Sequence, residues 1–262
     1  MSDLKALIFD VDGTLADTEA NGHRVAFNKA FAEADLDWHW SVELYGELLA
    51  VTGGKERIFH YIQNYHPQFI APGELGEFIA ELHRAKNGYY ADMVAAGEIP
   101  LRPGVRRLLL EAQQAGLRLA IATTTSMENV EALLEHSLDP DAVSWFEVIA
   151  AGDVVAAKKP APDIYHYALK ALKLSPAQCL AVEDSLNGLR SALAADLKTL
   201  VTVSDYTRSE RFTGATLVVD QLGEPGQAMT VLEGDAKGAA MIDVTTLRLI
   251  FSDQESCIAE RA

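Results

Sequence analysis

The chain has 262 residues, 49% of them hydrophobic, which is enough to bury one large core or a core that carries an insert. Its 38 Asp and Glu outnumber its 22 Lys and Arg, and because the net charge of −16 repels nucleic acid backbones and anionic membranes, we expect neither as a partner. Two cysteines (Cys179 and Cys257), no signal-like start and no apolar run of about 18 residues predict a cytoplasmic protein.

Short apolar runs alternate with longer segments of helical period along the chain. The first run, Ala6–Phe9, ends directly before two aspartates. The later expected strands are Leu117–Ala122, Val148–Ala150, Cys179–Val182, Thr199–Val203 and Leu217–Val219. Helices are expected from Val105 to Gly116 and again from Pro162 onward. This alternation predicts an α/β fold with a doubly wound parallel sheet.

The first two expected strands are separated by about a hundred residues, far more than one crossover helix needs. Apolar side chains recur there at helical spacing, for example at Ile58, Tyr61 and Ile62. We predict an all-helical domain over residues 17–95, inserted into a Rossmann-like core of residues 1–16 and 96–230. The pattern of residues 231–262 fits a last helix or a last strand equally. The aromatic residues expected in the core of the helical domain are Trp38, Trp40, Tyr45, Phe59, Tyr61 and Tyr65.

Polar residues follow the expected strands at the point where each one ends. They are Asp10 and Asp12, then Thr123 and Thr124, then Lys158 and Lys159, and finally Glu183 and Asp184. Doubly wound sheets bind ligands beyond the carboxyl ends of their strands, so these side chains should meet. Neighbouring carboxylates repel each other unless a cation lies between them, and oxygen ligands of this kind suit Mg²⁺. Each aspartate taken alone is equally consistent with a turn or a helix cap.

Four segments together carry a family resemblance. The segments FDVDGTL at 9–15, Thr123, KPAPD at 159–163 and EDS at 183–185 resemble, in order and spacing, the motifs of the haloacid dehalogenase superfamily. The resemblance implies that Asp10 is a nucleophile, Asp12 a general acid and base, and Lys159 a charge-neutralising group. It also implies that Thr123 and the Thr124 amide bind the phosphoryl group. The implied Mg²⁺ ligands are Asp10, Asp12 and Asp184, with Glu183 acting through water or orienting its neighbour.

A second cluster of donors lies in the expected helical domain, which resembles the mobile cap of that family. Two glycines followed by Lys55 and Arg57 at the start of a helix offer amides and cations to an anionic group. TGGKER at 52–57, DTEANGHRVAFN at 17–28 and ELYGELL at 43–49 are similar to the CbbY-type sugar phosphatases, which act on xylulose-1,5-bisphosphate. The substrate-binding residues implied by this resemblance are Glu19, His23, Thr52, Gly53, Gly54, Lys55, Arg57 and Lys86.

These resemblances imply a Mg²⁺-dependent phosphatase of a small sugar bisphosphate, with an aspartyl phosphate as intermediate, and a monomer is the expected state. Two alternatives share the fold and its nucleophile. A β-phosphoglucomutase-like enzyme would return the phosphoryl group to a sugar hydroxyl, and a phosphoglycolate-type phosphatase would take a smaller substrate. A third alternative, a catalytically idle binding protein, is disfavoured by the complete set Asp10, Asp12, Lys159 and Asp184.

Overall fold

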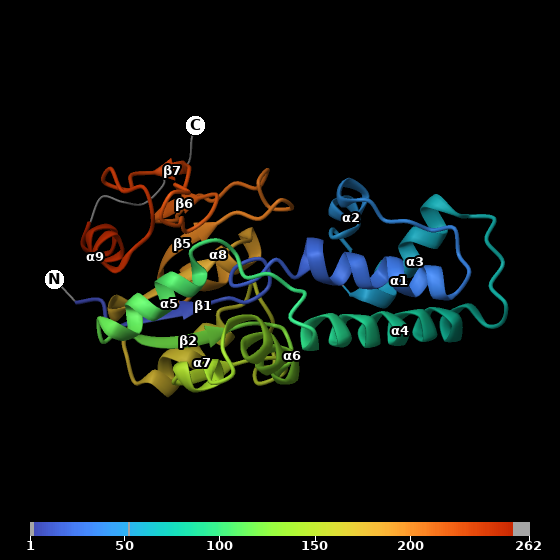
Figure 1. Cartoon of the computed structure of the whole chain (residues 1–262), viewed down its shortest axis with the longest axis horizontal. Helices are drawn as coiled ribbons and strands as arrows, with labels where there is room; N and C mark the ends of the chain where they lie inside the picture. The colour runs from blue at the N-terminus through green and yellow to red at the C-terminus, as the bar shows by residue number, and fades with distance from the viewer. Residues whose placement is uncertain (1–2, 52, 254–262) are drawn as a thin grey trace. The chain divides into compact units, whose positions relative to one another are not determined.

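The computed structural model describes residues 3–51 and 53–253. The chain forms two compact units, which we call the core unit (Met1–Asp17 and Pro100–Ala262) and the helical unit (Thr18–Ile99). In Figure 1 the strands belong to the core unit, and the helical unit contains helices alone. Two residues singled out in the sequence, Thr52 and Cys257, lie outside the described residues.

A seven-stranded sheet forms the centre of the core unit. Its strands are β1 (Ala6–Phe9), β2 (Arg118–Ala122), β3 (Val148–Ala150), β4 (Cys179–Glu183), β5 (Lys198–Thr202), β6 (Leu217–Val219) and β7 (Val231–Gly234). They lie in the order β3-β2-β1-β4-β5-β6-β7, and every neighbouring pair except β6 and β7 is parallel. Because the chain winds outward on both sides of β1, the predicted doubly wound fold is confirmed. The expected strands differ from the observed ones by one residue at most at any end.

The helices of the core unit cover both faces of this sheet. They are α5 (Val105–Gln114), α6 (Met127–Leu133), α7 (Asp163–Leu172), α8 (Leu186–Ala194) and α9 (Val244–Ser252), with the shorter η2 (Leu134–Leu138), η3 (Ala142–Trp145) and η4 (Pro176–Gln178). All four β1 residues are buried. Ala6 and Ile8 pack with residues of α7 and α8, so the alternate residues Leu7 and Phe9 point to the opposite face. A strand buried on both faces reads as a continuous apolar run, which is why it was recognisable in the sequence.

The last part of the described chain forms both a strand and a helix. β7 pairs antiparallel with β6, and α9 contacts α5. The Arg107 guanidinium of α5 fastens this segment, because it donates to the carbonyl oxygens of Leu222 (3.2 Å), Gly223 (2.9 Å) and Ile242 (3.0 Å). The sequence pattern was consistent with either a strand or a helix here, and this segment contains one of each.

The helical unit contains η1 (Glu19–His23), α1 (Arg24–Glu33), α2 (Val42–Leu48), α3 (Gly54–Tyr65) and α4 (Leu75–Ala95). Helix α4 packs against α1 and α3. Between the helices, Trp40 packs on Phe27 and Phe31, with ring centroids 4.6 and 4.9 Å apart. The Asn28 side chain fixes the Trp40 backbone by donating to its carbonyl oxygen (3.0 Å) and accepting from its amide (2.8 Å).

The aromatic core of the helical unit is smaller than the sequence predicted. Trp38, Trp40, Tyr45 and Tyr61 are buried, whereas Phe59 and Tyr65 are 42% and 43% exposed. The prediction for these two residues was wrong because α3 has one buried stripe, which contains Ile58, Tyr61 and Ile62. Phe59 lies one residue off that stripe, and the Tyr65 hydroxyl donates to Glu47 Oε2 (3.1 Å) on the outside.

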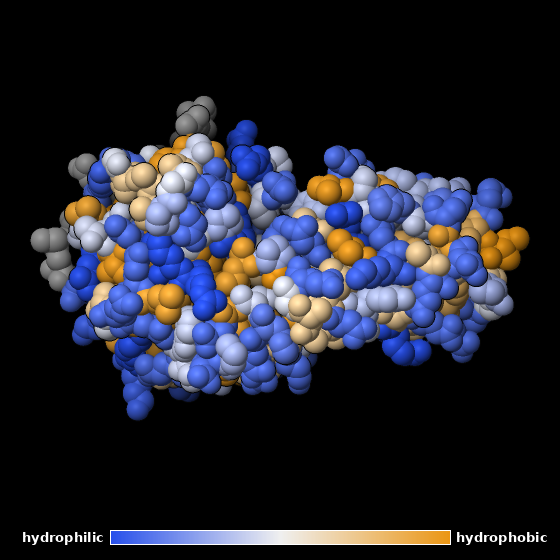
Figure 2. Space-filling view, viewed as in Figure 1, coloured by the Kyte–Doolittle hydropathy of each residue, from blue (hydrophilic) through white to orange (hydrophobic). Residues whose placement is uncertain are grey.

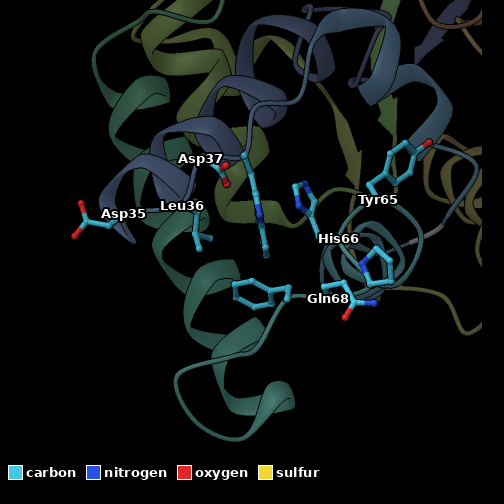
Figure 3. A pocket seen from close by; sticks show the side chains of 9 residues that line it. Asp35, Leu36, Asp37, Tyr65, His66 and Gln68 are labelled. Atoms are coloured by element: carbon cyan, nitrogen blue, oxygen red, sulfur yellow. The ribbon is translucent and has the colours of Figure 1, made fainter.

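A shallow hollow of about 570 Å³ lies beside this aromatic core (Figure 3). The residues that line it are Asp35, Leu36, Asp37, Trp38, Tyr65, His66, Pro67, Gln68 and Phe69. None of the predicted substrate residues that the structure describes is among them. The hollow is therefore separate from the predicted site.

On the face of the molecule seen in Figure 2, hydrophilic side chains cover most of the surface and hydrophobic ones form small separate patches. No helix within residues 3–51 and 53–253 has the length and apolar content needed to cross a membrane.

Candidate active site

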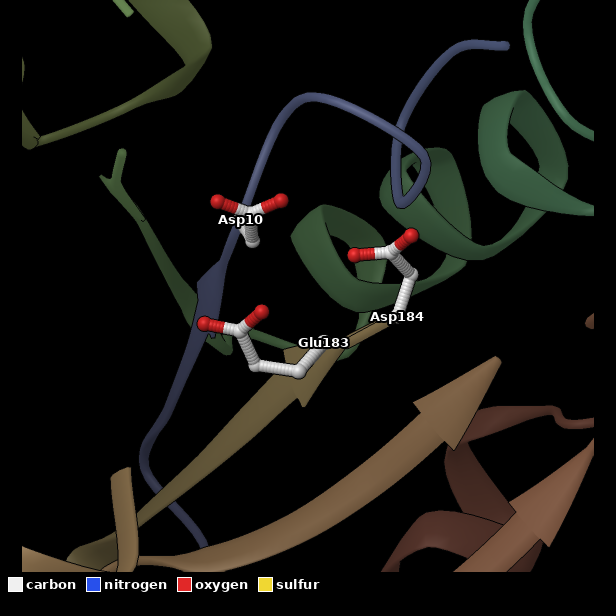
Figure 4. Close-up of side chains that lie close together, drawn as sticks. All are labelled: Asp10, Glu183 and Asp184. Carbon is white, nitrogen blue, oxygen red and sulfur yellow. The ribbon is translucent and has the colours of Figure 1, made fainter. Parts of the chain in front are cut away.

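Three buried carboxylates meet at the carboxyl end of the sheet (Figure 4). Asp10 directly follows β1, Glu183 is the last residue of β4, and Asp184 follows it. The register of the two strands brings them together, because Phe9 is paired with Val182 and the Asp10 amide donates to the Val182 carbonyl oxygen (3.0 Å). One carboxylate oxygen from each of the three residues lies within 4.8 Å of the others. They form the one group of three or more metal-ligating side chains found among the described residues.

One lysine lies among these acids. The Lys159 ammonium donates to Asp10 Oδ1 (2.7 Å) and to Glu183 Oε1 (2.6 Å), and its side chain is 9% exposed. Its neighbour Lys158 is 43% exposed and forms an ion pair with Asp153 (2.6 Å). The structure thus separates the two lysines that the sequence places side by side.

The electrostatics of the cluster follow from burial and crowding. Burial raises the pKa of Asp184 well above its ordinary value, and the nearby Asp10 and Glu183 carboxylates raise it further. Burial also raises the pKa of Glu183, to about 7, against the opposing effect of Lys159. Burial alone would lower the pKa of Lys159, but Asp10 and Glu183 outweigh it and the pKa is raised. The lysine therefore stays charged, and the raised pKa values of Asp184 and Glu183 reflect a shortage of positive charge beside these two carboxyl groups.

The same residues fit a divalent cation. Glu183 Oε2 is buried and has no hydrogen-bond partner among the residues that the structure describes. Glycines leave room around two of the carboxylates, since a Cβ on Gly13 would overlap the Asp184 carboxylate and a Cβ on Gly188 would overlap that of Glu183. Buried oxygen ligands with surplus negative charge are the set that a hard cation such as Mg²⁺ prefers.

Asp12 lies in the turn after β1, where its Oδ2 accepts a hydrogen bond from the Thr125 hydroxyl. Thr125 belongs to the segment after β2, and its amide donates to Thr123 Oγ1 (3.2 Å). Thr123 is buried, and Thr124 is exposed at the end of the strand. The structure therefore brings Asp12 together with the threonine segment, but through Thr125, to which the sequence assigned no role.

In the helical unit, hydrogen bonds link Arg57, Tyr45 and Glu19. The buried Arg57 donates through Nη1 to the Tyr45 hydroxyl (2.9 Å) and through Nε to the Leu48 carbonyl oxygen (3.2 Å). The Tyr45 hydroxyl in turn donates to Glu19 Oε2 (2.7 Å). Arg57 and Glu19, 38 positions apart in the sequence, are thus linked through one tyrosine.

A second buried cation lies nearby in the same unit. Lys86 is 6% exposed, and its ammonium lies 3.1 Å from His23 Nδ1 and 5.3 and 5.1 Å from the ring centroids of Phe27 and Tyr90. Burial, followed by the charge of Lys86, holds the pKa of His23 well below its ordinary value, so the imidazole is neutral and accepts from the lysine.

Not every predicted residue of the helical unit joins these contacts. Lys55 and Gly53 are exposed. Gly54 lies against His83, whose ring nitrogen a Cβ at this position would overlap. Thr52 is outside the described residues.

Residues 4–196 match the family model of the haloacid dehalogenase-like hydrolases. The chain is 50% identical over 226 residues to the protein CbbY of Cupriavidus necator, and the match covers 86% of this chain and 89% of that protein. It is 53% identical to CbbY of Rhodobacter capsulatus, over 81% of this chain and 91% of that protein. The crystal structure of CbbY from Rhodobacter sphaeroides in complex with phosphate superposes with a TM-score of 0.70 and 50% identity, covering 83% of this chain and 94% of that one.

The chain belongs to the haloacid dehalogenase-like hydrolases. Its relatives at about 50% identity place it among the CbbY-type members, and it is a phosphatase. Membership of this hydrolase family argues against the alternative of a catalytically idle binding protein. A β-phosphoglucomutase from Clostridium difficile, with 22% identity and a TM-score of 0.60, shares the fold alone.

Sequence reasoning missed two further residues that contact the acidic cluster or its loop in this hydrolase. The fully buried Tyr165 of α7 donates through its hydroxyl to Glu183 Oε1, and the Lys159 ammonium lies 5.4 Å from the centre of its ring. Arg102 donates to the carbonyl oxygen of Gly13 (2.5 Å) in the loop after β1. A tyrosine in the first turn of a helix reads as a core residue, and an arginine before Pro103 reads as a solvated one, so neither carried a signal.

Proposed function

We propose that this CbbY-type hydrolase is a Mg²⁺-dependent phosphatase that works through an aspartyl phosphate on Asp10, and that its substrate is a small sugar bisphosphate, xylulose-1,5-bisphosphate. The observation that carries the proposal is the Lys159 ammonium held between Asp10 (2.7 Å) and Glu183 (2.6 Å) within the buried carboxylate cluster. A carboxylate that is to attack an anionic phosphoryl group needs its charge offset, and Lys159 provides this.

In the first step, one Asp10 oxygen attacks phosphorus and the bond from phosphorus to the sugar oxygen breaks. Asp12 gives its proton to the leaving sugar oxygen. The Thr125 hydroxyl, which donates to Asp12 Oδ2, orients the carboxyl group for this transfer. Thr123 and the Thr124 amide are proposed to bind the equatorial phosphoryl oxygens.

In the second step, the Asp12 carboxylate takes a proton from a water molecule, whose oxygen attacks the phosphorus of the aspartyl phosphate. The Asp10 carboxylate and inorganic phosphate are then released. The residues proposed to hold Mg²⁺ are Asp10, the carbonyl of Asp12 and Asp184, with Glu183 adjoining. Bound there, the ion would neutralise phosphoryl charge as a Lewis acid.

Two arguments support the bisphosphate. A variant of CbbY from Rhodobacter sphaeroides, 50% identical to this chain, has been crystallised in complex with xylulose-(1,5)bisphosphate. In this chain, the helical unit buries two cations: Arg57, which donates to the Tyr45 hydroxyl and the Leu48 carbonyl oxygen, and Lys86, which lies 3.1 Å from His23 Nδ1. We propose that these cations, with Glu19, His23, Gly53, Gly54, Lys55 and Thr52, bind the second phosphate and the far end of the sugar.

The substrate is tested by measuring phosphate release from xylulose-1,5-bisphosphate, phosphoglycolate and hexose phosphates, each with Mg²⁺ and again after EDTA treatment. We expect kcat/KM for the pentulose bisphosphate to exceed the others by about tenfold or more and activity to return when Mg²⁺ is added back. Equal rates across the panel would remove the bisphosphate proposal and leave the phosphatase. Isomerised sugar phosphate in place of free phosphate would favour the mutase alternative.

The nucleophile is tested by Asp10→Asn. We expect kcat to fall by about a thousandfold or more, because no aspartyl phosphate forms, while the thermal unfolding temperature stays close to that of the wild type. A mass increase corresponding to one phosphoryl group on a quenched peptide containing Asp10, present in the wild type and absent in the variant, completes the test. Persisting turnover in the variant would assign the chemistry to other residues.

A further inference from the structure

Arg102 connects three segments of the core unit through its side chain. Its Nη1 donates to the carbonyl oxygens of Gly13 (2.5 Å) and Thr202 (2.7 Å), and its Nη2 donates to those of Val203 (2.6 Å) and Asp220 (2.6 Å). Gly13 belongs to the loop after β1, Thr202 ends β5, Val203 follows it, and Asp220 follows β6. A planar guanidinium with five donors suits such a bridge, which a lysine cannot reproduce.

The backbone of the same residue holds the other end of that loop. The Arg102 amide donates to the Leu15 carbonyl oxygen (2.9 Å), the neighbouring Leu101 forms a β-bridge with Ala16, and the Asp17 amide donates to Pro100 (3.2 Å). Residues 100–102 therefore clamp residues 13–17, the segment that follows Asp12, from two directions.

This loop lies directly against one of the acids. Gly13 has φ +80°, and a Cβ there would overlap the Asp184 carboxylate, so the backbone at Gly13 forms one wall beside Asp184. The Arg102 guanidinium is also close enough to Asp184 for their charges to attract. A shift of the Gly13 carbonyl would thus move the backbone that lies against Asp184. It would also move Asp10 and Asp12, which precede Gly13 in the same loop.

We propose that Arg102 is a positioning residue for the metal site of this phosphatase: its guanidinium fixes the loop after β1 to the ends of β5 and β6 and so keeps Asp10, Asp12 and Asp184 at cation-binding distance. The inference rests on the Mg²⁺ site proposed above. Within the described residues, the Arg102 guanidinium donates to backbone carbonyl oxygens and to Thr202 Oγ1, so its effect on the acids is exerted through Gly13 and through charge. Loss of a residue that orients metal ligands typically costs about 10–100-fold in metal affinity or activity.

The test compares Arg102 with Arg107, which makes the same kind of contact elsewhere. Arg107 also donates to three backbone carbonyls, those of Leu222, Gly223 and Ile242, but these belong to the C-terminal segment of the core unit. Mg²⁺ affinity is measured by isothermal titration calorimetry on the full chain without substrate, for the wild type, Arg102→Ala, Arg102→Lys and Arg107→Ala. Thermal unfolding temperatures are recorded for all four.

We expect Arg102→Ala to weaken Mg²⁺ binding by about tenfold or more, and millimolar guanidinium chloride to restore part of the affinity. Arg102→Lys keeps the charge without the planar fork, so its affinity should lie between those of the wild type and Arg102→Ala. Arg107→Ala should lower the unfolding temperature while its Mg²⁺ affinity stays at the wild-type value.

A wild-type Mg²⁺ affinity in Arg102→Ala would overturn the proposal, because the site would then need no positioning by this residue. A wild-type Mg²⁺ affinity in Arg102→Lys would also overturn it, because charge alone would then suffice. An equal loss of Mg²⁺ affinity in Arg107→Ala would also overturn it, since the effect would then follow general stability. If Arg102→Ala does not fold, Arg102→Lys decides. A wild type that binds no Mg²⁺ would instead overturn the proposed function, so the two failures are distinguishable.

Discussion

The core unit and the helical unit both bury charged side chains, but with opposite sign and by different means. In the core unit, Lys159 is paired with two of three clustered carboxyl groups, so these groups outnumber the cation among them. In the helical unit, Arg57 donates to a hydroxyl and a carbonyl oxygen, and Lys86 lies against a neutral imidazole and two aromatic faces. A buried charge is costly unless it is paired or bound to a ligand.

The difference teaches what each unit lacks. Carboxyl groups that outnumber their lysine favour a cation, whereas two buried cations favour an anion. Each unit thus favours ligands of one charge, the core unit a cation and the helical unit an anion.

Among the changes that test this contrast between the two units, the largest effect is expected from the cations of the helical unit. Lys86→Met and Arg57→Met each remove a donor that we assign to the second phosphate, at about 1.5–3 kcal/mol for a charged hydrogen bond. We expect kcat/KM for xylulose-1,5-bisphosphate to fall by about 10–100-fold, mostly through KM, while kcat/KM for a sugar monophosphate changes little. The measurement is steady-state phosphate release on both substrates.

Arg84→Met is the matched control, because Arg84 is exposed on the same helix as Lys86. It should leave both substrates unaffected. A parallel loss on bisphosphate and monophosphate in Lys86→Met would break the comparison, since the lysine would then support the fold of the helical unit instead of a second phosphate.

The core site was largely predictable because parallel strands collect their following residues at one edge. Asp10 after β1, Thr123 after β2 and Asp184 after β4 lie next to a strand end that an apolar run marks in the sequence. Tyr165 and Arg102 were missed for the opposite reason. They reach the site from a helix and from a linker, and their contacts depend on packing that no local spacing encodes.

The helical unit was predictable as helices but not as a set of contacts. Periodicity marked α3 and α4, yet it could not show that Lys86 of α4 meets His23, 63 residues earlier, or that Tyr45 links Arg57 to Glu19. It also placed Phe59 and Tyr65 in the core, since a helical period identifies a stripe more reliably than its edges.

A smaller effect is expected from Tyr165→Phe, which removes one hydroxyl from the core site. Without this donor, Glu183 Oε1 keeps Lys159 as its partner, so the cluster loses orientation but not its ion pair. A net hydrogen bond of about 1 kcal/mol corresponds to roughly a fivefold fall in kcat. Tyr167→Phe, exposed on the same helix α7, should leave kcat unchanged. If the two variants behave alike, the hydroxyl has no part in orienting the cluster.

The smallest effect concerns acid stability, and it sharpens the contrast through His23. Burial and Lys86 hold the folded-state pKa of His23 below the unfolded value of about 6.5, so below pH 6.5 the unfolded chain binds the extra proton. The stabilising contribution is therefore complete above about pH 6.5 and is lost as pH falls toward the depressed folded pKa.

Unfolding temperatures between pH 5 and pH 7.5 measure this contribution directly. The wild type should lose stability on acidification more steeply than His23→Gln, in which no imidazole has to be kept neutral beside Lys86. His83, whose pKa burial lowers, and the core carboxyls Glu183 and Asp184, whose pKa values burial raises, are present in both proteins, so the difference between the two slopes reports His23. Equal slopes would mean that the His23 ring takes up its proton without loss of stability, for example by turning away from Lys86. The helical unit would then accommodate a further positive charge, and the contrast with the core unit would fail.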